Sequence, residues 1–226
     1  MAALRTRARV LAPDLPGFGR SAPLLEPPTI DDYADLVLAA LDARGIDGVT
    51  VVGLSMGGYL AFRLVERLGS RLQGLLLADT RANPDTEEGA RLRLELAAKV
   101  EEQGVQLAEA KFLPKLLGPT SIQLRSDVVD RVRAIIRENL PAGLATALRA
   151  MANRPDSTPL LSRLRCPVLC VAGEEDMLTP PDVARAMAEQ APGGRWVAIR
   201  GAGHLTNLEA PEEFNRALAE LVDLAR

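Results

Sequence analysis

The sequence predicts an α/β fold, in which a mostly parallel β-sheet carries helices on both faces. Short apolar segments alternate with amphipathic segments of helical length near both ends of the chain, and this alternation favours parallel strands joined by crossover helices. Between these two regions the sequence shows only helical periodicity. We therefore expect the 226 residues to form a core from residues 1–79 and 159–226, with a helical insertion at residues 80–158.

The first alternating region contains three predicted strands and two predicted helices. The strands, each a short apolar run, are expected at residues 9–13, 49–52 and 74–78. The first helix is expected to begin at Thr29, because Thr29 and Asp32 match a capping box, and to end near Gly45. The second helix follows the second strand directly and covers about residues 57–68.

The same signals divide the rest of the chain. Within the insertion, Thr86 and Ser126 are predicted helix N-caps. One glycine and two prolines are expected to separate its helices: Gly104, Pro114 and Pro141. After the insertion, strands are predicted at residues 168–171 and 196–199, and helices at about residues 181–190 and from residue 211.

Composition and charge argue against several classes of protein. The chain has 30 acidic and 27 basic residues, a net charge of −3 and no basic block, which disfavours nucleic-acid binding. The longest run without charge, residues 48–62, is shorter than the ~20 residues of a membrane-spanning helix. Arg5, Arg7 and Arg9 precede no apolar stretch, so a secretory signal is not expected. These features predict a cytoplasmic protein that does not bind membranes.

The two cysteines predict neither a disulfide nor a metal site. Cys166 and Cys170 lie in one predicted strand, where a rise of about 3.3 Å per residue separates them too widely for a disulfide. A single histidine in the chain does not complete the usual metal-ligand spacings. We expect buried structural thiols, and no metal or cofactor.

A serine stands at the junction between the predicted strand at residues 49–52 and the helix that follows. The motif is Gly53-Leu-Ser-Met-Gly57, with small residues two positions before and after Ser55. At such a junction the serine lies on a sharp, strained turn that exposes its hydroxyl, as a nucleophile requires. The alternative is an ordinary glycine-rich turn without chemistry.

A base and an acid are expected at the ends of later strands. His204 is the only histidine and follows the last predicted strand, at the sheet edge where parallel sheets place their sites. Asp176 follows the preceding strand and fits the chain order Ser, Asp, His. Three other carboxylates remain alternatives for the acid: Glu174, Glu175 and Asp79, which ends the strand at residues 74–78.

One further motif matches the sequence pattern of a dinucleotide-binding site. Gly17-Phe-Gly-Arg-Ser-Ala22 matches the glycine pattern of such sites. That pattern requires a helix whose N-terminus faces the pyrophosphate, and the prolines that follow exclude a helix there: Pro23, Pro27 and Pro28. We therefore predict no dinucleotide site.

Together these segments resemble the α/β-hydrolase family over essentially the whole chain. The matching segments, in family order, are residues 14–21, the turn at Ser55, residues 173–176 and residues 203–211. The narrower likeness is to small bacterial carboxylesterases and enol-lactonases. The resemblance implies that residues 80–158 form a cap over the active site, and that no cofactor is needed.

The resemblance also implies a reaction. Ser55 would attack a small carboxylic ester or lactone, His204 would transfer the proton, Asp176 would orient His204, and the backbone N–H of Met56 would stabilise the oxyanion. The aliphatic composition of the cap favours an aliphatic pocket. Three arginines that could bind a substrate carboxylate are expected instead at the solvated surface: Arg81, Arg125 and Arg154.

The chain departs from the family at its start. Family members normally begin with additional strands and a His-Gly loop that supplies a second oxyanion donor, whereas only eight residues precede Arg9 and no second histidine exists. The chain thus resembles a member without these strands, as either a misassigned start codon or a truly shortened protein would give, and residues 1–5 resemble the end of the helix after that loop. Besides a serine hydrolase, a non-catalytic or impaired fragment and a C–C bond hydrolase or acyltransferase with the same triad remain alternative hypotheses.

The missing strand leads to a prediction about the sheet. In the family it lies between the strands predicted here at residues 9–13 and 49–52. An empty position would leave backbone groups of both strands unpaired, at a cost of about 1–3 kcal/mol for each buried group. In a stably folded chain we therefore expect residues 10–12 to pair with residues 49–52, as a right-handed βαβ unit through the helix at Thr29.

Overall fold

The computed structural model describes residues 4, 7–23 and 28–225. In this part of the chain four strands form one parallel sheet, in the order β1-β2-β3-β4. The strands are β1 (Val49–Leu54), β2 (Leu72–Ala78), β3 (Val168–Gly173) and β4 (Arg195–Ile199). Because all four run in the same direction, their C-terminal ends meet along one edge of the sheet.

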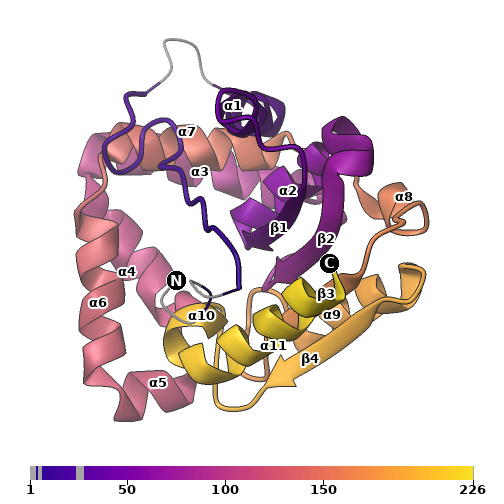
Figure 1. The fold of residues 1–226 in the computed structure, drawn as a ribbon. Coiled ribbons are helices and arrows are strands. Elements are labelled where there is room, and N and C mark those ends of the chain that lie inside the picture. Colours follow the sequence, from indigo (N-terminus) through magenta and orange to yellow (C-terminus); the bar gives the residue numbers. More distant parts are fainter. Residues whose placement is uncertain (1–3, 5–6, 24–27, 226) are drawn as a thin grey trace.

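Helices cover both faces of the sheet, as the sequence predicted (Figure 1). These helices are α1 (Ile30–Asp42), α2 (Met56–Leu68), α9 (Pro181–Gln190), α10 (Thr206–Glu209) and α11 (Pro211–Leu224), with a short 3-10 helix, η2, at Gly69–Arg71. Helices α2 and α9 pack on one face, α1 packs on α2, and α11 packs on the other face. Alternate residues of each central strand enter the two cores: Leu75 and Leu77 face α2, whereas Leu76 and Ala78 face α11.

Local sequence signals account for most of these boundaries. Thr29 is the N-cap of α1, and its hydroxyl and backbone form a capping box with Asp32. The predicted strands at residues 49–52, 74–78, 168–171 and 196–199 correspond to β1 to β4. The predicted helices at about residues 57–68, 181–190 and from residue 211 correspond to α2, α9 and α11.

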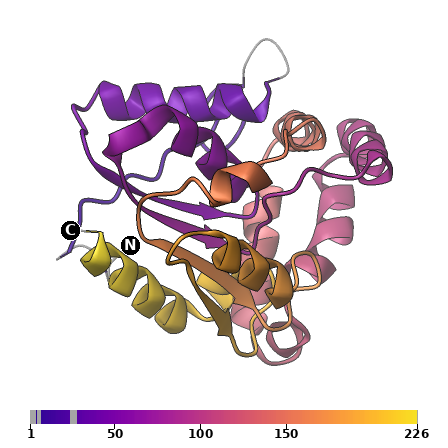
Figure 2. The same ribbon diagram turned by 90° about the vertical axis from the view of Figure 1, so that its right-hand side faces the viewer.

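The residues between β2 and β3 contain helices and no strand. They are α3 (Glu87–Gln103), α4 (Val105–Leu116), α5 (Pro119–Leu124), α6 (Ser126–Arg137), α7 (Pro141–Ala152) and α8 (Thr158–Leu161). Figure 2 shows that α3 to α7 lie beyond the C-terminal ends of the strands. Their apolar faces form a separate core, which includes Val100, Val132 and Leu148.

Two predicted boundaries within this helical segment are wrong. Thr86 caps α3 as predicted, by accepting a hydrogen bond from the Gly89 N–H. Ser126, however, is the first residue of α6, whose N-cap is Arg125. Pro114 lies inside the last turn of α4 instead of ending it.

The predicted strand at residues 9–13 is also wrong. No backbone hydrogen bond joins these residues to another segment in the described part of the chain, and Val10 and Leu11 are exposed by 40% and 39%. The expected pairing of residues 10–12 with β1 is therefore absent. Strand β1 is an edge of the sheet, with the side chain of Val52 exposed.

Contacts on both sides of this segment explain why it does not pair with β1. Leu4 is buried in the core beneath α11, on one face of the sheet. Gly17 packs against α7, where a Cβ on Gly143 would lie 2.1 Å from the Gly17 carbonyl oxygen. The described residues 7–17 run from the region of α11 toward α7 (Figure 1). An apolar run becomes a strand only where a neighbouring strand completes its hydrogen bonds. The contacts of Leu4 and Gly17 hold residues 9–13 away from β1, so this run has no such neighbour among the described residues.

Two predictions concern features at the limits of this description. Apart from Leu4, residues 1–5, expected to end a helix, lie outside the described residues. Among those that are described, no helix combines the length and apolarity needed to cross a membrane.

Candidate active site

Ser55 occupies a strained turn between β1 and α2. Its φ of 52° and ψ of −116° place it in a region that residues other than glycine rarely adopt. The turn is tight: a Cβ at Gly53 would lie 2.4 Å from the Gly57 carbonyl oxygen, so only glycine fits there. The Ser55 N–H donates to the carbonyl of Ala78 at 2.9 Å, which fixes the turn against β2. The half-buried side chain of Ser55 therefore lies at the C-terminal edge of the sheet.

His204 and Asp176 complete a chain of hydrogen bonds that begins at Ser55. The Nε2 atom of His204 lies 2.8 Å from the Ser55 Oγ, and its Nδ1 lies 2.8 Å from Oδ2 of Asp176. His204 follows β4 and Asp176 follows β3, and both side chains are buried. The structure thus brings together three residues that the sequence proposed as nucleophile, base and acid.

The surroundings of Asp176 keep its carboxylate ionised. Burial raises its pKa, but the hydrogen bond to His204, the charge of His204 and bonds from Thr179 together lower that pKa below its ordinary value. The backbone N–H groups of Leu178 and Thr179 and the Thr179 hydroxyl all donate to this carboxylate. An ionised Asp176 only accepts hydrogen bonds, so Nδ1 of His204 carries the proton and Nε2 is free to accept the proton of Ser55.

None of the three alternative acids forms a hydrogen bond with His204. Glu174 is exposed. Glu175 accepts hydrogen bonds from the N–H and hydroxyl of Thr120, at 2.8 and 2.5 Å. Asp79 is buried, but its carboxylate bonds to Gly173 and Thr206 and not to the imidazole of His204. Among these carboxylates, only Asp176 contacts His204.

Comparison with known proteins agrees with this geometry. The model of the alpha/beta hydrolase family matches residues 1–217. The chain belongs to the α/β-hydrolase family. The 3-oxoadipate enol-lactonase 1 of Acinetobacter baylyi is 30% identical to this hydrolase, over 95% of the present chain and 78% of the relative.

Solved structures agree with the fold of the hydrolase. A thermophilic esterase from Thermogutta terrifontis superposes with a TM-score of 0.90 and 36% identity, covering 94% of this chain and 78% of that one. The enol-lactonase from Burkholderia xenovorans LB400 superposes with a TM-score of 0.89 and 26% identity, covering 98% and 84%. The α/β-hydrolase fold predicted from the sequence is therefore confirmed, and the chain is an enzyme of this family.

Two carboxylates attach the helical segment of the hydrolase to the loops of the site. Glu175, next to Asp176, holds Thr120 at the start of α5, as described above. Glu209 in α10 accepts from the N–H of Gly118 at 2.8 Å and from the N–H of Leu205 at 3.0 Å. No local sequence signal predicted the contacts of Glu175 with Thr120 and of Glu209 with Gly118, because they join positions 55 and 91 residues apart.

The glycine-rich motif at Gly17 forms turns and not a helix. Residues 16–21 are turns and bends, and no helix begins within residues 7–23 of the hydrolase. Gly17 donates its N–H to the Ser21 carbonyl, and Asp14 accepts from the N–H of Arg20. The motif therefore lacks the helix N-terminus that a pyrophosphate would need.

The prediction that Arg154 lies at the solvated surface is wrong. Its guanidinium is buried, pairs with Asp85 at 2.9 Å and lies 4.1 Å from the centroid of the Tyr59 ring. The carbonyls of Met151 and Asn83 accept two further hydrogen bonds from it. This arginine therefore joins α2 to the helical segment of the hydrolase. The guanidinium of Arg81 donates to the Leu178 carbonyl.

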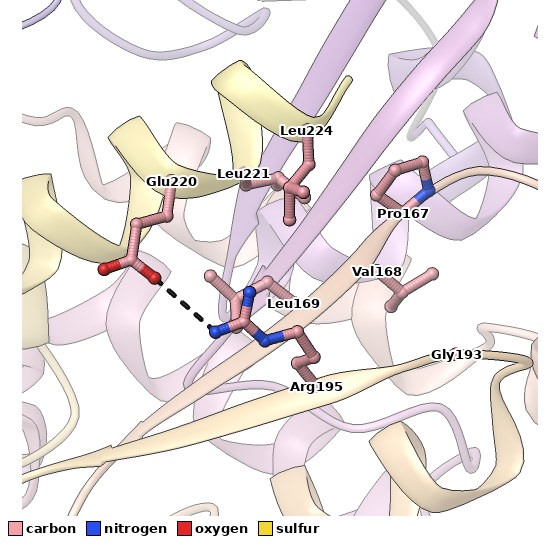
Figure 3. A pocket seen from close by; sticks show the side chains of 8 residues that line it. All are labelled: Pro167, Val168, Leu169, Gly193, Arg195, Glu220, Leu221 and Leu224. Atoms are coloured by element: carbon pink, nitrogen blue, oxygen red, sulfur yellow. Dashed lines mark ion pairs between the residues drawn. The ribbon is translucent and has the colours of Figure 1, made fainter. Parts of the chain in front are cut away.

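A small cavity lies at the other end of the sheet (Figure 3). It measures about 40 Å³ and lies between α11 and the first residues of β3 and β4, beside an ion pair of 3.6 Å between Arg195 and Glu220. A space of this size holds about one water molecule, too little for a substrate. The structure shows no cluster of three metal-ligating side chains among its described residues.

Proposed function

We propose that this α/β-hydrolase is a serine hydrolase that cleaves small carboxylic esters or lactones through Ser55, His204 and Asp176. The observation that carries the proposal is the continuous chain of hydrogen bonds from the Ser55 hydroxyl through the His204 imidazole to the Asp176 carboxylate. The relatives support the substrate class, since they include enol-lactonases and esterases.

The proposed reaction has two steps. In the first, the Ser55 Oγ attacks the carbonyl carbon of the substrate while Nε2 of His204 takes the hydroxyl proton, and His204 then returns that proton to the leaving alkoxide. In the second, His204 removes a proton from water, the resulting hydroxide attacks the acyl carbon, and His204 returns the proton to the Ser55 Oγ as the bond to the acyl group breaks. Asp176 stabilises the charged imidazole in both steps without taking its proton.

The backbone N–H of Met56 is proposed as an oxyanion donor. Met56 is the first residue of α2, so its N–H has no acceptor within the helix and lies beside the nucleophile. The positive end of the α2 dipole adds to the stabilisation of negative charge at this point. One donor of this kind typically contributes about 10²–10³ in turnover.

Residues 80–158 are proposed as the cap of this enzyme. Their helices lie beyond the C-terminal ends of the strands, where the Ser55 side chain is located (Figure 2). Glu175 and Glu209 tie this segment to the two loops that carry Asp176 and His204. A cap in this place would bound the acyl and alcohol sides of the substrate.

Labelling with a fluorophosphonate probe tests the proposal, because the probe reacts only with an activated serine. We expect the purified chain to be labelled and to hydrolyse a short p-nitrophenyl ester. Ser55→Ala should abolish both, with an unchanged circular dichroism spectrum. Ser126→Ala, which removes an exposed serine on α6, is the matched control and should retain both.

Two results would contradict the proposal. Labelling that persists in Ser55→Ala would remove Ser55 as the nucleophile. A folded wild-type chain without labelling would instead favour the non-catalytic alternative.

A further inference from the structure

The turn that follows β2 contacts the nucleophile on both sides of its backbone. The carbonyl of Ala78 accepts from the Ser55 N–H at 2.9 Å. The hydroxyl of Thr80 donates to the Ser55 carbonyl at 2.8 Å. Residues 78–80 therefore fix the backbone of Ser55 directly, although they lie on the neighbouring strand.

Asp79, in the middle of this turn, bonds to the two other segments of the proposed triad. Its Oδ1 accepts from the N–H of Gly173, the last residue of β3, at 3.1 Å. Its Oδ2 accepts from the hydroxyl of Thr206 at 2.5 Å and from the Thr206 N–H at 3.3 Å. Gly173 opens the loop that carries Asp176, and Thr206 begins α10 directly after the loop that carries His204. A single carboxylate thus joins the acid loop to the base loop.

The position of Asp79 is costly in two respects. Its φ of 47° is left-handed, and among the described residues only Ser55 shares a positive φ without being glycine. Its side chain is fully buried, although burial disfavours the ionised form of a carboxylate. Backbone strain and buried charge persist where the surrounding structure requires them, and they concentrate at functional sites.

We propose that Asp79 is a positioning residue for the reaction. Its ionised carboxylate holds the His204 loop against the end of β3, so that Nε2 of His204 faces Ser55 while Nδ1 faces Asp176. Asp79 itself touches none of the reacting atoms. This inference rests on the proposed function, because it assigns Asp79 to the same site.

The charges around Asp79 make its role dependent on pH. Burial and, to a smaller extent, the charge of Asp176 raise the pKa of Asp79 to about 7. The hydrogen bond from Thr206 and the charge of His204 oppose this shift. Two other charged side chains nearby have their own partners: Glu209 binds Gly118 and Leu205, and Arg81 binds the Leu178 carbonyl. A protonated carboxyl group cannot accept all the bonds that Gly173 and Thr206 donate. The positioning effect should therefore exist above neutral pH and disappear below it.

Steady-state kinetics over a range of pH test this inference. Asp79→Asn keeps the volume of the side chain but cannot ionise. At about pH 8 we expect its kcat to fall roughly 10- to 100-fold, the scale of small misalignments at a reacting centre, with KM little changed. As the pH falls below about 6, the kcat of the wild type should approach that of the variant, because a protonated aspartate is neutral like asparagine. Asp47→Asn, in an exposed loop before β1, is the matched control.

A second measurement does not depend on activity. The chain has one histidine, so the downfield imidazole proton in its NMR spectrum reports only the bond from Nδ1 of His204 to Asp176. We expect this signal in the wild type, in Asp47→Asn and in Thr206→Ser, which keeps the hydroxyl. It should be broadened or lost in Asp79→Asn and in Thr206→Val, which removes the donor to Asp79.

Two results would overturn the inference. One is a ratio of wild-type to Asp79→Asn kcat that is the same at every pH, as a merely structural residue would give. The other is an unchanged imidazole signal in both Asp79→Asn and Thr206→Val. Neither depends on the labelling of Ser55, so failure of this inference can be told apart from failure of the proposed function.

Discussion

Two neighbouring turns of this hydrolase each carry a buried aspartate that bonds to the segment around His204. The turn after β2 carries Asp79, and the turn after β3 carries Asp176. Both carboxylates are nearly inaccessible and both accept a hydrogen bond from a threonine hydroxyl, Thr206 or Thr179. Burial alone therefore does not distinguish them.

Their pKa values nevertheless move in opposite directions. Burial raises the pKa of Asp79 to about 7, whereas the pKa of Asp176 is lowered because bonds from His204 and Thr179 outweigh its burial. Asp176 contacts an imidazole that can carry a positive charge, at 2.8 Å, and Asp79 contacts only neutral donors. The comparison supports the proposal that Asp176 is the acid, because Asp176 alone of the two contacts the proposed base, although both are buried and both follow a strand.

The largest expected effect separates the two aspartates by activity. Asp176→Asn should lower turnover by about 10⁴-fold, the size typical of this change in Ser-His-Asp enzymes, because His204 loses both its orientation and its charge stabilisation. Asp79→Asn should cost much less at every pH. Hydrolysis of the same p-nitrophenyl ester by both purified variants measures the difference. Equal losses, or a larger loss in Asp79→Asn, would move the acid to the turn after β2.

The next effect separates the two aspartates by stability. A folded-state pKa raised from 3.8 to about 7 means that Asp79 stabilises the fold only while protonated, and this contribution is lost as the pH rises from about 4 through 7. Relative to Asp79→Asn, the free energy of unfolding of the wild type should therefore fall by about 4 kcal/mol across this range.

Denaturant unfolding of both proteins at about pH 5 and pH 8 measures this change. We expect Asp79→Asn to gain stability over the wild type as the pH rises, while it loses activity. For Asp176 the sign is opposite. Its pKa is lowered in the fold, so the ionised carboxylate stabilises the protein at pH values above its ordinary pKa, and this stabilisation is lost on acidification. If the free energies of unfolding of the wild type and Asp79→Asn differed by the same amount at both pH values, Asp79 would not titrate in the folded protein over this range.

The smallest effect concerns the carboxylate next to Asp176. Glu175→Gln keeps an acceptor for Thr120 but removes the charge from two hydrogen bonds, so we expect a loss of about 1–2 kcal/mol in stability. Turnover should change far less than in Asp176→Asn. Thermal unfolding measures the loss, and Glu174→Gln, which changes an exposed neighbour, should leave it unaltered. A loss of turnover as large as that of Asp176→Asn would contradict the separate roles assigned to these adjacent residues.

Much of the site could be predicted from the sequence because its signals are local. The glycines around Ser55 are needed within one turn, where a Cβ at Gly53 would meet the Gly57 carbonyl oxygen. His204 and Asp176 each follow a strand directly, and parallel strands bring such positions to one edge of the sheet. Strand and helix periods, together with the cap at Thr29, predicted the elements that support them.

Other features depend on contacts that no local pattern contains. Asp79 reaches Gly173 and Thr206 across 94 and 127 residues, and only the packed sheet brings these groups within hydrogen-bond distance. The apolar run at residues 9–13 has the composition of a strand, but strand pairing needs a partner, and contacts at Leu4 and Gly17 direct the run away from β1. The sequence by itself determined which local conformations and chemical groups the chain has. The sequence favoured Asp176 among four carboxylates, and the tertiary structure decided between them, because hydrogen bonds form between groups that are close in space, whatever their separation along the chain.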